Sequence, residues 1–201
     1  MPLSTLSADN LLAYWGTTYG KYASLHSAYS SSGANELSGG SPAYARQAVS
    51  WGTPASNSMA LAGTPYSFNV PASSTAAFAG YWDSLTGGNF QGMFPLGNAI
   101  GYAFAAPTST STLRAPGSAD AANQTVVVVP TGGATLPTGL TAGTVYYVKS
   151  PSFDSFELSA TSGGSAISLS ADGSGLVQAI TAEVFSGAGT YGLANGTVSL
   201  V

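Results

Sequence analysis

Few side chains in this 201-residue chain have the chemistry that catalysis requires. His26 is the only histidine and there is no cysteine, so metal sites that need two imidazoles or a thiolate are excluded. A nucleophile triad would place His26 beside a serine and a carboxylate, but serine is so common here that proximity in sequence carries no information. No nucleophile-elbow motif is present. We therefore predict no catalytic, cofactor-binding or metal-binding residues.

The carboxylates are too dispersed to predict hydrolytic chemistry. They are Asp9, Glu36, Asp83, Asp120, Asp154, Glu157, Asp172 and Glu183. A glycosidase needs two carboxylates that face a sugar cleft, and Asp154 with Glu157, three residues apart across a predicted turn, is a weak candidate. Asp172 begins an Asp-Gly-Ser-Gly turn that lacks the run of oxygen ligands preferred by calcium. These patterns predict that the protein is not an enzyme.

Arg46 is one of only four cationic residues and lies in the largely apolar segment Gly39–Trp51. A buried guanidinium is strongly destabilising unless it is paired. We therefore predict a structural ion pair with Glu36 or Asp83, or hydrogen bonds to loop carbonyls. A contact with a neighbouring subunit is the alternative.

Charged residues make up only 6% of the chain, against about 25% in a typical soluble domain. Weak long-range repulsion favours close packing between like subunits. With four Lys and Arg residues in total, the chain cannot form the cationic patch that nucleic-acid binding needs. No apolar run approaches the roughly 20 residues of a membrane span, and the first residues do not resemble a signal peptide. We expect no membrane insertion, and assembly in a cytoplasm.

The elements that position these residues are predicted to be mostly short strands. One helix is predicted over 7–15, with Ser7 as its cap and Gly16 as its end. Alternating residues predict a strand over 22–29, and the apolar segment 44–51 predicts a central strand.

The aromatic residues divide into two predicted groups. Phe78 and Trp82, four residues apart and so on one face of a strand, are predicted to lie in the core with Trp51. Tyr14 and Trp15 precede the sandwich and are predicted to contact a neighbouring molecule.

The fold class is predicted to be all-β. We expect a jelly-roll-like β-sandwich with a short N-terminal helix and a second small β module inserted before the last strands. The expected boundaries are 1–18 for the helical segment, 19–106 plus 181–201 for the sandwich, 107–118 for a Thr/Ser-rich linker, and 119–180 for the inserted module.

Several motifs occur in a recognisable order. The segment Gly39-Gly-Ser-Pro-Ala-Tyr-Ala-Arg-Gln-Ala-Val-Ser-Trp51 is followed by Ser56-Asn-Ser58 and by Asp83-Ser-Leu-Thr-Gly-Gly-Asn89, and Tyr22–Ala28 precedes it. This pattern, over roughly 7–106, resembles a family of small virion proteins of tailed bacteriophages, of the tail-fibre or minor structural type. Gly187–Leu200 is similar to the ending of the same family.

The predicted insertion has a resemblance of its own. Its segments Leu136–Val148, Asp154–Ser159, Gly163–Leu169 and Asp172–Gly175 are similar to a small β module that is repeated in phage tail and fibre proteins. Neither resemblance implies an active site.

The resemblances imply a non-enzymatic structural component of a tailed-phage virion, either a minor tail or fibre protein or a capsid decoration protein. Its implied partners are major capsid or tail proteins and other copies of itself, with a homotrimer expected by analogy with fibres. The alternative is a receptor-binding module that contacts host surface glycan, which would need an exposed Tyr or Trp platform. A third class, an enzyme that degrades cell envelope, would need a Ser–His pair or paired acids in a cleft.

Overall fold

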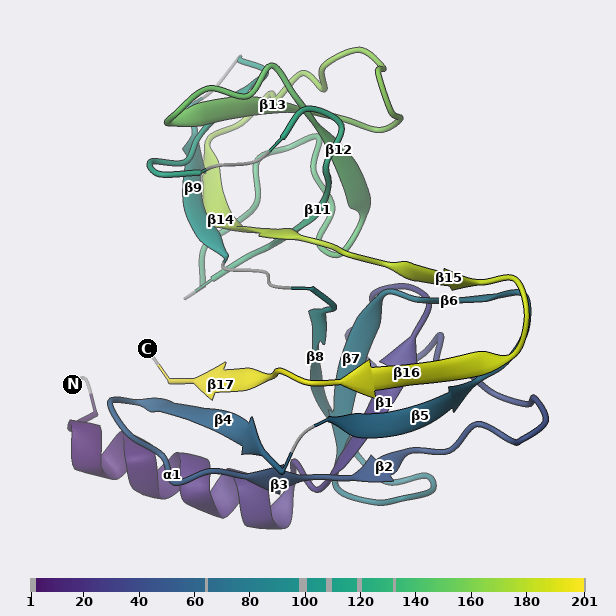
Figure 1. Cartoon of the computed structure of the whole chain (residues 1–201). Coiled ribbons are helices and arrows are strands. Elements are labelled where there is room, and N and C mark those ends of the chain that lie inside the picture. The colour runs from purple at the N-terminus through teal and green to yellow at the C-terminus, as the bar shows by residue number, and fades with distance from the viewer. Residues whose placement is uncertain are drawn as a thin grey trace. The chain divides into compact units, whose positions relative to one another are not determined.

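The computed structural model describes residues 3–63, 65–97, 101–107, 110–118, 121–131 and 133–200. Within these residues the chain forms one α-helix and seventeen short strands, as Figure 1 shows. The predicted all-β fold class is therefore confirmed. The chain divides into two compact units, residues 1–94 with 182–201, and residues 95–181.

The first unit holds the helix and eleven strands. They are α1 (Thr5–Thr18), β1 (Tyr22–His26), β2 (Gln47–Ala48), β3 (Ser50–Trp51), β4 (Ser58–Ala62), β5 (Tyr66–Val70), β6 (Ser74–Ala76), β7 (Phe78–Trp82), β8 (Phe90–Pro95), β15 (Glu183–Phe185), β16 (Gly189–Leu193) and β17 (Thr197–Ser199). Its sheets have the orders β2-β1-β7-β8, β17-β4-β3, β16-β5 and β15-β6. The three C-terminal strands thus pair with β6, β5 and β4 in turn. Strand β7 is buried along its whole length, so side chains pack on both of its faces.

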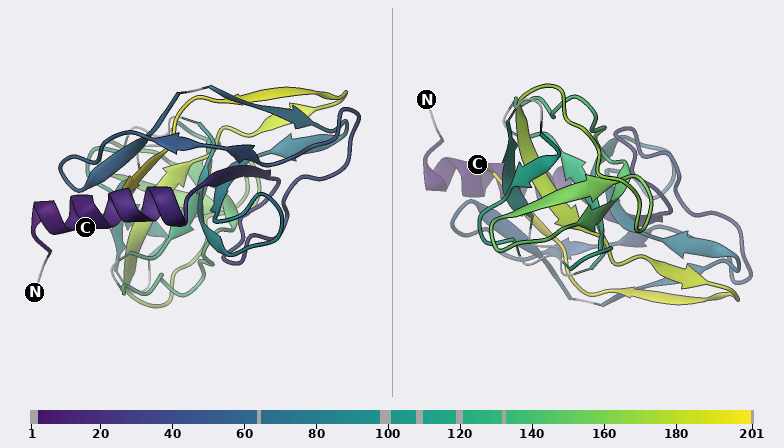
Figure 2. Two further views of the ribbon diagram at one scale, coloured as in Figure 1. Left: turned by 90° about the horizontal axis from the view of Figure 1, so that it is seen from below. Right: turned by 90° about the horizontal axis from the view of Figure 1, so that it is seen from above.

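The helix α1 begins and ends outside the predicted limits of 7–15. Ser4, not Ser7, is the N-cap, because the Ser4 hydroxyl accepts a hydrogen bond from the Ser7 N–H at 3.3 Å. Gly16 lies inside the helix instead of ending it. A Cβ on Gly16 would lie 2.9 Å from Met59 Cε, so the missing side chain allows α1 to approach β4 closely. The helix lies along β3 and β4 in the views of Figures 1 and 2.

The segment 44–51 does not form the single central strand that its apolar residues predict. Only Gln47–Ala48 and Ser50–Trp51 are strands, and they belong to different sheets. Between them the Val49 N–H donates to the Lys21 carbonyl at 2.9 Å. The chain changes sheets at Val49, and β1 and β7 take the inner positions of the four-stranded sheet instead.

The second unit is a closed six-stranded barrel. Its strands are β9 (Tyr102–Ala106), β10 (Thr112–Arg114), β11 (Thr125–Val129), β12 (Val145–Lys149), β13 (Ser155–Ser159) and β14 (Gly173–Ala179), in the order β10-β13-β12-β11-β14-β9. Its core contains Phe104, Leu113, Val126, Val128, Tyr146, Val148, Phe156, Leu158, Leu169 and Val177, all almost fully buried. The ring of strands is seen in Figure 1.

The barrel includes residues that composition predicts to lie elsewhere. Composition predicts a sandwich segment up to residue 106 and a linker over 107–118, yet β9 and β10 are both barrel strands. Leu113 in β10 is fully buried in the barrel core. A Thr/Ser-rich sequence is typical of a linker and also of a strand with one face in solvent, so composition alone does not separate the two.

Candidate functional site

Arg46 forms a two-pronged ion pair. Its Nη2 donates to Glu36 Oε2 at 2.7 Å and its Nε donates to Oε1 at 2.9 Å. Its Nη1 donates to the carbonyl oxygens of Ser84 and Gly87 at 3.0 and 2.7 Å. The predicted ion pair and the predicted bonds to loop carbonyls are therefore both present, with Glu36 and not Asp83 as the partner.

The guanidinium of Arg46 also lies over an aromatic ring. Its Cζ is 3.5 Å from the ring centroid of Trp82, and only 9% of the Arg46 side chain is exposed. A cation–π contact is stronger where water is excluded. Four hydrogen bonds use most of the five N–H donors of a guanidinium. Arg46 therefore holds the 84–87 turn against the sheet and retains little capacity to bind a ligand.

Tyr44 extends this group of side chains. Its hydroxyl accepts a hydrogen bond from the Leu25 N–H at 2.7 Å and donates to Glu36 Oε1 at 3.4 Å. Burial raises the pKa of Tyr44 well above its ordinary range, so the phenol is neutral at every physiological pH. Tyr44 thus ties the Arg46–Glu36 pair to strand β1.

A buried hydrogen-bond network lies on the neighbouring part of β1. Ser24 Oγ and His26 Nε2 are 2.7 Å apart, and Trp82 Nε1 donates to Ser24 Oγ at 2.8 Å. On the other side of the imidazole, His26 Nδ1 is 2.9 Å from the Ala34 carbonyl oxygen. Sequence reasoning missed this network. The two-residue spacing places Ser24 and His26 on one strand face, but the approach of Trp82 depends on the β1–β7 register.

The partners of His26 define its tautomer. The Ala34 carbonyl can only accept, so Nδ1 carries the proton and Nε2 accepts from the Ser24 hydroxyl. Burial lowers the pKa of His26, and the imidazole is therefore neutral at pH 7.

Ser24 and His26 make the same contact as the serine and histidine of a catalytic triad, but here the pair has a structural role. Both side chains are fully buried, so no substrate reaches the hydroxyl. The third member is the Ala34 carbonyl, whereas a triad uses a carboxylate there. The carboxylate of Glu36 is held by Arg46. The arrangement satisfies buried polar groups in the interior of the sheet.

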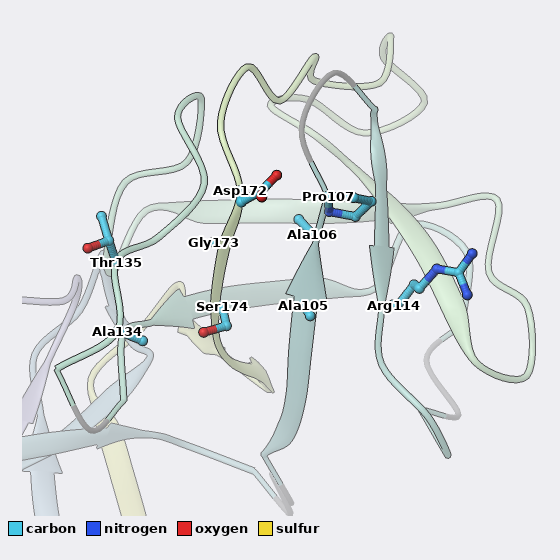
Figure 3. Close-up of a pocket in the computed structure, with 9 residues that line it drawn as sticks. All are labelled: Ala105, Ala106, Pro107, Arg114, Ala134, Thr135, Asp172, Gly173 and Ser174. Carbon is cyan, nitrogen blue, oxygen red and sulfur yellow. The ribbon is translucent and has the colours of Figure 1, made fainter.

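The barrel carries a hollow on its own surface, drawn in Figure 3. Its volume is about 720 Å³, and it is lined by Ala105, Ala106, Pro107, Arg114, Ala134, Thr135, Asp172, Gly173 and Ser174. Figure 3 shows Arg114 and Thr135 pointing outward at opposite margins, so the polar groups do not converge on one point. None of the described residues that line the hollow is aromatic, so these residues do not form the stacking platform expected of a glycan site.

The helix α1 exposes apolar residues on its outer face. Leu6, Leu11 and Tyr14 are 71%, 49% and 57% exposed. An α-helix turns about 100° per residue, so Leu6 and Tyr14 lie on the side away from the buried Ala8 and Leu12, whereas Leu11 lies at the margin of the buried side, about 60° from Ala8. Tyr14, predicted to contact a neighbouring molecule, is exposed, and the contact itself stays a prediction.

The tryptophans differ in part from the prediction. Trp15, predicted to face a neighbouring molecule, packs edge-on against Trp51 at 5.3 Å and Tyr81 at 5.9 Å between ring centroids. Trp15 directly follows Tyr14 on α1. Sequence spacing alone does not show which of these two adjacent residues faces the rest of the protein. Phe78 and Trp82 are buried as predicted, while Trp51 is only partly buried.

Within the described part of the chain, no three His, Asp or Glu side chains lie close enough to hold a metal ion. No helix of that part is long and apolar enough to cross a membrane. Comparisons of the chain with protein-family models, curated proteins and solved structures found no match.

Proposed function

We propose that the chain is a non-enzymatic structural component of a tailed-phage virion, a minor tail or fibre protein or a capsid decoration protein. It acts by packing against other virion proteins and other copies of itself. The observation that carries this proposal is α1, which buries Ala8 and Leu12 and leaves the large apolar side chains of Leu6, Leu11 and Tyr14 exposed. Large apolar side chains that are exposed close together commonly mark an interaction surface.

The charge distribution supports the same proposal. Asp9 is the only charged residue of α1, and its Oδ1 accepts a hydrogen bond from the Asn57 N–H at 2.9 Å. The outer face of the helix therefore carries no charge that association would have to desolvate. The motif order over 7–106 adds the virion context.

Immunogold labelling of intact virions with an antibody to residues 119–180 tests the proposal. Gold over heads would identify a capsid decoration protein, and gold confined to tails would identify a tail or fibre protein. The matched control is the same antibody after absorption with purified protein. Absence of the chain from gradient-purified particles, by immunoblot of the denatured particles, would contradict the proposal.

A further inference from the structure

We propose that Asn195 is a site of spontaneous, non-enzymatic modification, at which the side-chain amide is lost through a cyclic imide formed with the backbone nitrogen of Gly196. These two residues are the only Asn-Gly pair in the chain. They lie in the connection between β16 and β17. The reaction needs only water and does not depend on the proposed role in a virion.

The reaction closes and then opens a five-membered ring. Asparagine is among the thermolabile residues of proteins. The Gly196 nitrogen, after losing its proton to hydroxide, attacks Cγ of Asn195, and the side-chain nitrogen leaves as ammonia. Water then opens the imide at either carbonyl. One product is aspartate, and the other is isoaspartate, in which the main chain runs through the side-chain carbon.

The Asn195 side chain is free to reach this geometry. It is exposed, and no hydrogen bond of its amide group is found among the described residues. Residues 194–196 are neither helix nor strand, so no regular ladder of hydrogen bonds fixes the main chain at the point of attack. Gly196 has no Cβ that would hinder ring closure.

The attacking nitrogen is also available. The Gly196 carbonyl accepts a hydrogen bond from the Leu61 N–H at 2.9 Å, but no group in the described part of the chain accepts one from the Gly196 N–H. Gly196 is buried and has to be a glycine, because a Cβ there would collide with the Tyr81 hydroxyl and lie 2.8 Å from Leu61 Cδ1. Packing of the core therefore requires the residue type that makes the preceding asparagine most labile.

The other described asparagines lack one or more of these features. Asn57 precedes a small residue, but the Ser58 N–H that would attack it donates to the Ala55 carbonyl at 3.0 Å. Asn10 is exposed but lies within α1 and precedes the bulky Leu11. Four others precede larger residues and have side chains held by hydrogen bonds: Asn35, Asn69, Asn89 and Asn123.

Isoaspartate at this position has a structural consequence. It lengthens the main chain by one carbon between β16, which is paired with β5, and β17, which is paired with β4. Both strands are fixed by their partners, so the added carbon displaces the Gly196 carbonyl from the Leu61 N–H that it now accepts from. We expect β17 to be less firmly paired with β4 after the reaction.

Mass spectrometry of the freshly purified full chain tests the proposal. During incubation at 37 °C and pH 8 the chain should gain one mass unit, and chymotryptic peptides should place the gain at residue 195. The gain should appear at least fivefold faster than at pH 6, because the attacking nitrogen must lose its proton. Asn195→Gln cannot form the five-membered ring and should abolish the gain, while Asn10 in the same sample should keep its amide.

Absence of the gain at residue 195 in the folded chain would overturn the proposal. A sample unfolded in urea then shows whether the fold or the local sequence prevents the reaction. A gain of equal rate at Asn10 would also count against it, because the exposed connection would then have no special reactivity.

Hydrogen exchange tests the consequence for β17. The product carries one more negative charge, so ion exchange separates it from the unreacted chain. In the isoaspartate product the amides of Leu61 and of β17 should exchange faster than in the fresh chain. Asn195→Gln incubated in the same way should show no change. Equal exchange in the product and the fresh chain would refute the expected loss of pairing.

Discussion

A Cβ built on Gly80 would lie 2.6 Å from Nε2 of His26. Gly80 is also directly opposite Ser24 in the β1–β7 register, and the same Cβ would lie 2.8 Å from Ser24 Oγ. Both neighbours are held by buried hydrogen bonds, so neither can move away without losing a partner. Because Gly80 has no side chain, it leaves room for the Ser24–His26 contact.

Gly80→Ala should therefore lower the free energy of unfolding by about 2–3 kcal/mol, through overpacking and a weakened buried hydrogen bond. Urea unfolding followed by tryptophan fluorescence measures it. The matched control is Gly187→Ala, where a Cβ meets no atom within 4 Å, and we expect a change within about 0.5 kcal/mol. Equal effects of the two substitutions would contradict the packing account.

Arg46→Lys should destabilise the first unit by about 2–4 kcal/mol. A lysine cannot reproduce the two-pronged contact with Glu36 while also donating to the Ser84 and Gly87 carbonyls. Thermal and urea unfolding measure the loss. The matched control is Arg114→Lys, since Arg114 is exposed on the barrel, and we expect it to change stability by less than about 0.5 kcal/mol. A neutral Arg46→Lys would show that the ion pair is dispensable.

The buried imidazole of His26 should make the stability of the folded chain depend on pH. Burial lowers its pKa in the folded chain below the ordinary value of 6.5, so below about pH 6.5 the unfolded chain binds more protons. Stability should be full at neutral pH and should fall as the pH drops from 6.5 toward the folded pKa. His26→Gln should remove this slope. Since the chain has a single histidine, its imidazole resonance in NMR gives the folded pKa directly, and a value at or above 6.5 would refute the prediction.

Much of the local chemistry was predictable from single residues. A lone arginine in an apolar segment needs a counterion, and Glu36 was one of two carboxylates expected to supply it. The all-β class follows from short apolar runs separated by Gly and Pro turns.

What sequence reasoning missed depends on cross-strand register. The network of Ser24, His26 and Trp82 requires β1 to pair with β7 so that Gly80 faces Ser24. No local sequence pattern predicts which strands pair with each other. The same limit explains the segment 44–51, whose sequence predicts one strand. The segment instead changes sheets at Val49, where the Val49 N–H donates to the Lys21 carbonyl.

The barrel offers a test of its own, with two phenylalanines three residues apart. Phe156 is 1% exposed within the barrel core, whereas Phe153 is 84% exposed. Phe156→Ala should lower the free energy of unfolding of the barrel by about 3–5 kcal/mol, because it leaves a cavity among close-packed strands. Phe153→Ala should change it by less than about 0.5 kcal/mol.

Hydrogen exchange read by mass spectrometry is the appropriate measurement for this pair. All three tryptophans, Trp15, Trp51 and Trp82, lie in the first unit, so their fluorescence does not report directly on the barrel. Phe156→Ala should accelerate exchange of the amides of β11 and β14, which are hydrogen-bonded neighbours in the barrel, and Phe153→Ala should not. Unchanged protection in Phe156→Ala would mean that this ring does not hold the barrel together.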